Sequence, residues 1–274
     1  MSMGPQSLPI GVFDSGVGGL TVLRALREAL PRESFLYLGD TARLPYGTKS
    51  PQTVERYAKQ SAQVLVDRGV KLLVIACNTV SAVAVETLRE QFGPLPVVGV
   101  VEPGAEAACA ATSSGHILIT GTEGTIRGGA YERAIRRRRP GAVVLGQPCP
   151  LFVALAEEAW TLGDVPKLAA RRYLAPHLDA DGALDTVVLG CTHFPVLAGV
   201  VQSVVGPEVT VVDSAMTTAG AVRSLLEQLG LASPNPVPGQ LALLATDDAE
   251  RFARVGSGFL STPLRAEDVE LVDL

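Results

Sequence analysis

Two cysteines, Cys77 and Cys191, stand in matching places in the sequence. Each follows a short apolar, β-branched run, 72–76 or 186–190, and precedes small polar residues. Runs of this length and composition are typical of buried strands. Ligands of open α/β sheets bind just beyond the carboxyl ends of the strands. We therefore predict that the two thiols lie at strand ends, on either side of one pocket.

Two facing thiols suit the inversion of a carbon centre by proton transfer. One removes a proton from the carbon, and the other returns a proton to the opposite face. A thiolate forms only where its pKa is lowered or a neighbour takes the proton. Asp14, at the end of the first apolar run, is a candidate neighbour of Cys77, and His193 is a candidate neighbour of Cys191. The alternative is that these cysteines are buried core residues, as free cysteines commonly are.

Composition limits the class of protein. A chain of 274 residues is long enough for one large domain or two medium ones. Its hydrophobic content of 47% is ordinary for a soluble globular protein, and its net charge of −5 argues against a general nucleic-acid binder. We expect no nucleic-acid partner.

The cysteine and lysine positions argue against several other classes. The four cysteines have no C-x-x-C pair and no zinc-like spacing, so we expect no metal site. We find no secretory signal and no apolar run of about 18 residues, so we expect a cytoplasmic chain with reduced thiols and no membrane partner. None of the four lysines follows an apolar strand, which disfavours a pyridoxal-phosphate enzyme. We expect no cofactor.

The first part of the chain alternates between expected strands and helices. Strands are predicted at 9–13, 35–39, 72–76 and 97–100, and helices at 20–30, 51–69 and 82–91. This alternation predicts a parallel, doubly wound sheet. The glycine-rich turn 14–19 lacks the third glycine of a dinucleotide fingerprint, so we interpret it as a tight strand-to-helix turn.

From residue 102 the pattern begins again. Strands are predicted at 116–120, 143–146, 186–190 and 209–212, and helices at 130–139, 151–160, 165–174, 195–204 and 216–229. A proline-rich linker, 233–239, precedes a strand at 241–246, and the rest of the tail has no assigned type. The weak repeat predicts two similar α/β halves with the site between them. The arginines 136–139 end a helix, where the helix dipole favours cations, so we expect a solvated face.

Four motifs resemble the aspartate/glutamate racemase family, and its glutamate racemases most closely. They are 11–21 (GVFDSGVGGLT), 39–47 (GDTARLPYG), 76–79 (ACNT) and 190–193 (GCTH). The resemblance implies cofactor-independent interconversion of L- and D-glutamate, which supplies D-glutamate for peptidoglycan. It also implies two flavodoxin-like domains related by pseudo-symmetry, residues 1–101 plus 209–274 and residues 102–208.

The resemblance also implies roles for particular residues. Cys77 would serve D-glutamate and Cys191 L-glutamate, and Asp14, His193 and Glu157 would assist as catalytic residues. The substrate-binding pairs would be Asp14-Ser15, Tyr46-Gly47, Asn78-Thr79 and Thr192-His193. These pairs offer hydroxyl, amide and backbone donors for carboxylates, and Asp14 could accept from the ammonium group. The sequence departs from the family at Ala154 and Phe194, and the adjacent Glu158 leaves open which carboxylate faces the site.

Three other interpretations remain open at this point. An aspartate racemase would use the same two thiols with a shallower pocket. A binding or regulatory protein on this fold would leave both thiols inert. A cysteine hydrolase based on Cys191 and His193 would leave Cys77 without a function. The sequence does not decide whether the chain forms a homodimer.

Overall fold

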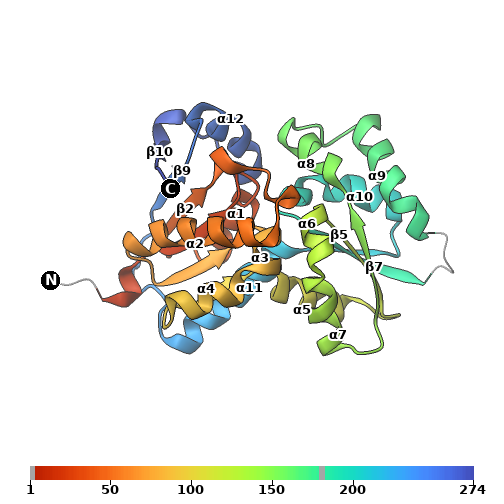
Figure 1. Cartoon of the computed structure of the whole chain (residues 1–274), viewed down its shortest axis with the longest axis horizontal. Helices are drawn as coiled ribbons and strands as arrows, with labels where there is room; N and C mark the ends of the chain where they lie inside the picture. The colour runs from red at the N-terminus through yellow and green to blue at the C-terminus, as the bar shows by residue number, and fades with distance from the viewer. Residues whose placement is uncertain (1–3, 179–182) are drawn as a thin grey trace.

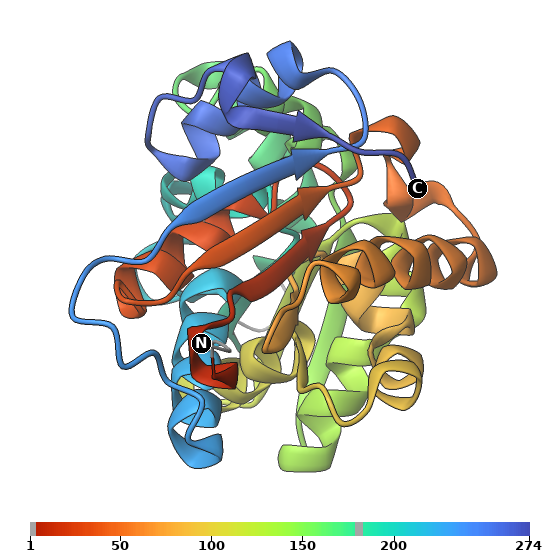
Figure 2. The same cartoon turned by 90° about the vertical axis from the view of Figure 1, so that its left-hand side faces the viewer.

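The computed structural model describes residues 4–178 and 183–274, which form two parallel sheets in two lobes (Figure 1). The first sheet has the strand order β10-β9-β2-β1-β3-β4, and the second has the order β6-β5-β7-β8. Figure 2 shows neighbouring strands of the first sheet pointing in the same direction. The strands are β1 (Ile10–Asp14), β2 (Phe35–Gly39), β3 (Leu72–Ile75), β4 (Val97–Gly99), β5 (His116–Gly121), β6 (Val143–Pro148), β7 (Leu184–Gly190), β8 (Thr210–Asp213), β9 (Leu241–Ala245) and β10 (Val269–Leu271).

The two sheets share one topology. The order β2-β1-β3-β4 in the first corresponds to β6-β5-β7-β8 in the second, and every described pairing is parallel. The predicted α/β class and the repeat of two doubly wound halves are therefore confirmed. Under this correspondence β3 matches β7, so the two cysteines follow equivalent strands.

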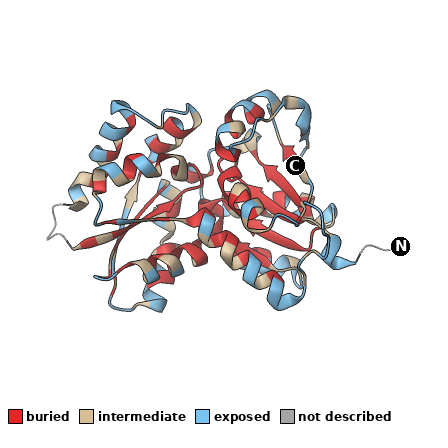
Figure 3. Cartoon of the chain, turned by 180° about the vertical axis from the view of Figure 1, so that it is seen from behind, coloured by how far each residue is buried: buried red, intermediate tan, exposed pale blue. Residues whose placement is uncertain are grey.

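Helices cover both faces of each sheet. In the first sheet, Val12 of β1 packs in one buried cluster and its neighbour Phe13 in another. In the second sheet, Leu118 and Ile119 of β5 likewise pack in two different clusters. Burial is concentrated in the strands and in the inner faces of the helices (Figure 3). The α-helices are α1 (Leu20–Ala29), α2 (Pro51–Asp67), α3 (Asn78–Val83), α4 (Val85–Phe92), α5 (Val101–Ala111), α6 (Glu123–Gly128), α7 (Ala130–Arg138), α8 (Pro150–Glu157), α9 (Asp164–Leu178), α10 (Ala198–Val205), α11 (Ser214–Leu229) and α12 (Ala249–Leu260).

Short 3-10 helices complete the described elements: Pro5–Ser7, Thr41–Arg43, Tyr46–Thr48, Phe194–Leu197 and Ala266–Asp268. Within the parts of the chain that are described, none of the helices combines the length and apolar composition needed to cross a membrane.

Strand pairing differs from the predicted domain division at one place. The sequence-based boundary put residues from 209 onward with the first domain, but β8 pairs with β7 and extends the second sheet. The chain returns to the first domain only with α11, which packs against α1. The reason is that β8 is the fourth strand of the repeated unit. It completes the second sheet as β4 completes the corresponding part of the first.

Two other segments were wrong or incomplete in the sequence-based assignment. The run Glu102-Pro103-Gly104, from which the second half was expected to begin and to which no helix was assigned, lies in the first turn of α5. Proline is tolerated there because its missing N–H would have no partner inside the helix. The tail beyond 246 contains α12 and β10, which complete the first domain beside β9.

Candidate active site

A cavity of ≈ 340 Å³ lies between the two domains, at the carboxyl ends of the strands. Its volume falls at the small end of the range of about 300–1,000 Å³ typical of ligand pockets. Both Cys77 and Cys191 line it, one from each domain. The other residues that line the cavity and were predicted for the site are Ser15, Tyr46, Gly47, Asn78, Thr79, Glu157, Thr192 and His193.

Cys77 follows β3 and begins α3, and it is 5% exposed. Its thiol donates a hydrogen bond of 3.4 Å to the hydroxyl of Ser15. Burial, and then the negative charge of Asp14, raise the pKa of Cys77 to about 12. Cys77 is therefore a protonated thiol at neutral pH, suited to donating a proton rather than accepting one.

Cys191 directly follows β7 and has a different environment. Its sulfur lies 3.9 Å from Nδ1 of His193, and Nε2 of the same ring lies 3.1 Å from Oε1 of Glu157. Burial acts to lower the pKa of His193, but its hydrogen bonds to Cys191 and Glu157 outweigh this and raise the pKa to about 10. The imidazole is therefore cationic at neutral pH and lies beside the sulfur.

The structure resolves which of two adjacent carboxylates faces the cavity. Glu157 lines the cavity, whereas Glu158 is exposed at the end of α8. The hydrogen bond to His193 is the largest of the influences that lower the pKa of Glu157, so this carboxylate is ionised at neutral pH.

Asn78 offers an unused donor. It is 2% exposed, and its Oδ1 accepts a hydrogen bond of 2.7 Å from the hydroxyl of Tyr131 in the second domain. Its Nδ2 has no hydrogen-bond partner among the described residues. A buried donor without an acceptor is costly, so an acceptor on a ligand would remove that cost. The neighbouring Thr79 hydroxyl lies 2.9 Å from that of Thr122, also across the two domains.

The Tyr46-Gly47 segment is fixed by a buried carboxylate behind it. The hydroxyl of Tyr46 donates to Asp40, and Asp40 also accepts from Arg43 Nε at 2.6 Å and from the hydroxyl of Thr246 at 2.9 Å. Arg43 is therefore committed to Asp40 and does not line the cavity.

Asp14 lies beneath the cavity rather than on its wall. It is fully buried, and it accepts a hydrogen bond of 3.0 Å from Gly16 N and one of 3.5 Å from the Thr192 hydroxyl. Each carboxylate oxygen thus has a donor, one from the glycine-rich turn and one from Thr192 of the second domain. The contact between Asp14 and a substrate ammonium group stays a prediction. Burial is the main influence on the pKa of Asp14, and it raises that pKa.

The glycine-rich turn has a packing role. A Cβ added at Gly18 would lie 2.4 Å from Nδ1 of His193, so only glycine allows the turn of the first domain to approach this ring. The turn therefore has two roles: it connects a strand tightly to a helix, and it lets one domain pack closely on the other.

Several residues near the site were missed by sequence reasoning. Arg251 and Phe259 lie on α12 in the unassigned tail; Arg251 contacts Glu157, and the Phe259 ring meets the ring of His193 edge to face. Tyr131 and Thr122 come from the second repeat. The polar turn 121–125 was a usable signal for Thr122, because its counterpart in the first repeat was already a candidate. Nothing in the tail sequence distinguished Arg251 from other surface arginines.

No group of three or more histidine, cysteine, aspartate or glutamate side chains within residues 4–178 and 183–274 is arranged to hold a metal ion.

Comparison with known proteins gives a consistent result. A family model described as Asp/Glu/Hydantoin racemase matches residues 10–222. This range contains both cysteines and covers more than half of the chain. The chain belongs to this racemase family. Its four motifs, quoted above, therefore lie in the family's region of similarity.

Relatives within the family cover nearly the whole chain. A glutamate racemase from Geobacter metallireducens is 51% identical over 255 residues, which is 93% of each chain. One from Chlorobaculum tepidum is 43% identical, covering 97% of this chain and 96% of the relative.

Solved structures of glutamate racemases share the fold. The enzyme from Thermus thermophilus, in complex with β-chloro-D-alanine, has a TM-score of 0.88 at 43% identity, covering 98% of both chains. That from Francisella tularensis, in complex with D-glutamate, has a TM-score of 0.90 at 34% identity and the same coverage. An aspartate racemase from Picrophilus torridus has a TM-score of 0.54 at 17% identity, which is a likeness of fold alone.

Proposed function

We propose that this chain is a cofactor-independent glutamate racemase that interconverts L- and D-glutamate with two cysteines. The observation that carries the proposal is that Cys77 and Cys191, at equivalent strand ends of the two domains, line one cavity. Peptidoglycan synthesis would be the consumer of its D-glutamate. The similarity to glutamate racemases favours glutamate over aspartate, because the likeness to the aspartate racemase is confined to the fold.

In the proposed reaction Cys191 is the base for L-glutamate. Its sulfur, beside the cationic His193, takes the α-proton and becomes a thiol. The Cys77 thiol gives its proton to the opposite face of the carbanion and becomes a thiolate. The reverse sequence converts D-glutamate. The raised pKa of Cys77 and the cationic His193 support this assignment, in which the resting enzyme accepts the L-enantiomer.

The substrate carboxylates require donors, and the cavity supplies them. Asn78 Nδ2 is the most suitable, because it is buried and has no acceptor among the described residues. Ser15, Thr79 and Thr192 add hydroxyl groups to the lining of the cavity. Hydrogen bonds to charged acceptors are stronger than neutral ones, so a carboxylate at this position is favoured over a neutral group.

The weakly acidic α-proton makes exclusion of water important. Cys77 and Cys191 are 5% and 6% exposed, so little water reaches either sulfur. Low exposure strengthens the electrostatic interactions around each thiol. Contacts across the domains, such as the one between Thr79 and Thr122, support this closed arrangement.

The function is tested by following circular dichroism after adding L-glutamate, and then L-aspartate, to extensively dialysed protein. We expect loss of the L-glutamate signal to zero, slow or no change with L-aspartate, and no effect of a chelator. Faster racemisation of aspartate would support the aspartate-racemase alternative. No change with either amino acid, together with saturable binding of glutamate, would support the non-catalytic binding protein.

Two further expectations accompany the proposed function. We propose a cytoplasmic location, where thiols stay reduced. A homodimer is supported by large apolar side chains exposed on and between α8 and α9, and light scattering coupled to size-exclusion chromatography tests it. Those side chains are Leu151, Trp160, Leu162, Val165 and Leu168.

A further inference from the structure

The C-terminal helix α12 reaches across the two domains to the Cys191 side of the cavity. It belongs to the first domain, since it lies between β9 and β10 of the first sheet, and Figure 1 shows it facing α8 of the second domain. Arg251, near its start, donates a hydrogen bond of 2.5 Å from Nη2 to Oε2 of Glu157 at the end of α8. The tail that sequence analysis left unassigned therefore touches the proton-transfer machinery.

Glu157 uses its two oxygens for two different partners. Oε1 accepts from Nε2 of His193 at 3.1 Å, and Oε2 accepts from Arg251. Rotation of the carboxylate would break one or both of these bonds. The orientation in which Glu157 holds the ring beside Cys191 is therefore set from the opposite domain.

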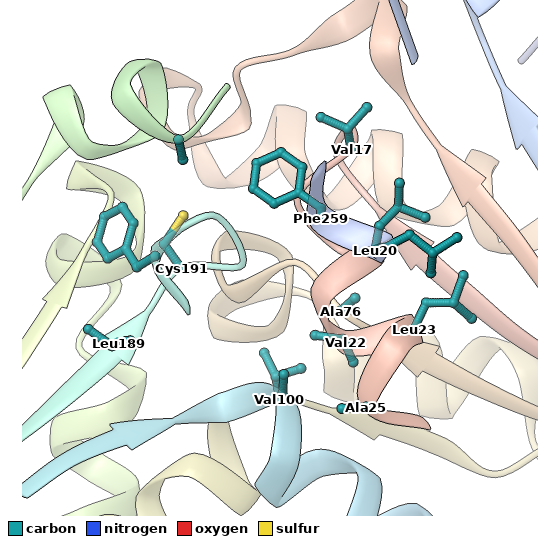
Figure 4. Close-up of a cluster of buried hydrophobic side chains, with 14 of the residues drawn as sticks. Val17, Leu20, Val22, Leu23, Ala25, Ala76, Val100, Leu189, Cys191 and Phe259 are labelled. Atoms are coloured by element: carbon teal, nitrogen blue, oxygen red, sulfur yellow. The ribbon is translucent and has the colours of Figure 1, made fainter. Parts of the chain in front are cut away.

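A second side chain of α12 holds the same ring. Phe259 meets His193 edge to face, with ring centroids 5.2 Å apart and an angle of 79° between the planes. Figure 4 shows Phe259 and Cys191 in one buried cluster with Val17 and Leu20. The helix thus contacts the Cys191–His193–Glu157 series at two points, one polar and one apolar.

We propose, resting on the proposed function, that Arg251 is a positioning residue for proton transfer at Cys191. It holds Glu157, and through it His193, when the two domains are closed around the substrate. Within residues 4–178 and 183–274, the Cys77 thiol is bonded to Ser15, and no arginine is bonded to either of them. The effect of Arg251 should therefore fall on one face of the substrate only.

Position and exposure separate this role from a contribution to stability. Arg251 is 46% exposed, and ion pairs with a partner exposed to this degree contribute little to the free energy of unfolding. Removing it should leave the fold intact. The variant Arg251→Gln tests the proposal, and Arg251→Lys retains the charge but not the planar fork. Arg254→Gln is the matched control, because Arg254 is an exposed arginine of the same helix outside the cavity.

Isotope effects distinguish the two faces. The two enantiomers have equal free energies, so kcat/KM must fall equally in both directions in any variant. If the step at Cys191 becomes slower, the deuterium isotope effect on kcat/KM should rise with α-deuterated L-glutamate and fall with α-deuterated D-glutamate. A general loosening of the domains would not move the two isotope effects in opposite directions.

We expect Arg251→Gln to lower kcat roughly tenfold, because misplacing a catalytic group slows proton transfer more than binding. In the same variant KM should change much less, and the two isotope effects should diverge. Arg251→Lys should recover part of kcat, and Arg254→Gln should match the wild type. An unchanged kcat, or isotope effects that move together, would overturn the proposal. Failure of the wild type to racemise glutamate would instead overturn the proposed function. The two failures can be told apart, because the wild type tests the proposed function and the Arg251 variants test the positioning role.

Discussion

The hydroxyl of Tyr131 in the second domain donates a hydrogen bond of 2.7 Å to Oδ1 of Asn78 in the first. The bond occupies Oδ1 of the buried amide and leaves Nδ2 free to donate to an acceptor, since Nδ2 has no partner among the described residues. Tyr131 is itself 2% exposed on α7, so it serves as a rigid support behind a wall of the cavity. One contact between the two domains thus also sets the orientation of a cavity-lining amide.

Tyr131→Phe tests the orientation of Asn78. Without the hydroxyl, the amide can rotate and present its oxygen to the substrate carboxylate. We expect KM for glutamate to rise several-fold, consistent with the loss of one hydrogen bond worth about 1 kcal/mol, while kcat falls less. Steady-state kinetics by circular dichroism provides the measurement. Tyr173→Phe is the control, since the Tyr173 hydroxyl binds Leu151 N away from the cavity. Equal KM values in the two variants would argue against this role.

Glu157→Gln tests the charge of His193. The pKa of His193 is raised from 6.5 to about 10, partly by its bond to Glu157, so the ring is protonated at neutral pH. Because this pKa is higher in the folded protein than the ordinary value of 6.5, the protonated ring stabilises the fold. The stabilisation is fully present below pH 6.5 and is lost as the pH rises through about 10. Removing the carboxylate charge should lower the His193 midpoint, measured by NMR of the ring protons. His177, whose pKa is lowered by burial, is the internal reference and should not move. A His193 midpoint that stays the same would contradict the assignment.

Asp14→Asn tests the carboxylate beneath the cavity. Its charge raises the pKa of both Cys77 and His193, so it influences proton transfer at each thiol without lining the cavity. We expect kcat to fall by roughly tenfold or more, while KM changes little. Initial rates with L- and with D-glutamate give both constants. A raised KM with unchanged kcat would instead indicate that Asp14 binds the substrate ammonium group when glutamate is present.

Lys71→Met tests a buried ion pair far from the cavity. Lys71 Nζ lies 2.5 Å from Glu33 Oε2, and both side chains are almost fully buried. Removing one partner of such a pair leaves an uncompensated charge, so we expect a loss of about 3–5 kcal/mol in urea unfolding. The double variant Lys71→Met with Glu33→Gln should recover part of this. Lys59→Met, which breaks an exposed pair with Glu55, should cost at most about 1 kcal/mol. Similar losses for Lys71→Met and Lys59→Met would refute the distinction.

Local sequence patterns predicted most of the strands of the fold. Short apolar runs such as 72–76 and 186–190 identified the strands that end at the cysteines, because parallel strands buried on both faces are apolar throughout. The fourth strand of the second unit was assigned to the wrong sheet. Residues 209–212 have the same apolar character whichever sheet they join, and only the pairing of β8 with β7 decides.

The candidate site was predictable where a motif marks a strand end. The tail was not, because the role of Arg251 depends on where α12 packs, and an exposed arginine on an amphipathic helix has no distinctive neighbours in sequence. The choice between Glu157 and Glu158 likewise depended on the side of α8 that faces His193. Long-range packing decides the role of Arg251 and the choice between the two carboxylates, and a local sequence pattern cannot predict such packing.

The two single cysteine variants test the central claim, that each thiol serves one face of the substrate. A serine hydroxyl is a far weaker acid than a thiol, so proton transfer at that face should nearly stop. Cys77→Ser and Cys191→Ser should therefore both lose racemisation of glutamate. Cys109→Ser should resemble the wild type, since Cys109 lies on α5 outside the cavity. Cys149 is a less clean control, because it is fully buried within electrostatic reach of Cys191.

Elimination of chloride from the two enantiomers of β-chloroalanine is the most direct measurement. Once the α-proton has been removed, chloride leaves from the β-carbon, and no second proton transfer from the enzyme is needed. Cys77→Ser should release chloride only from the L-enantiomer, through Cys191, and Cys191→Ser only from the D-enantiomer, through Cys77. Release from both enantiomers by either variant, or racemisation of glutamate at a normal rate by either one, would contradict the account of two facing thiols.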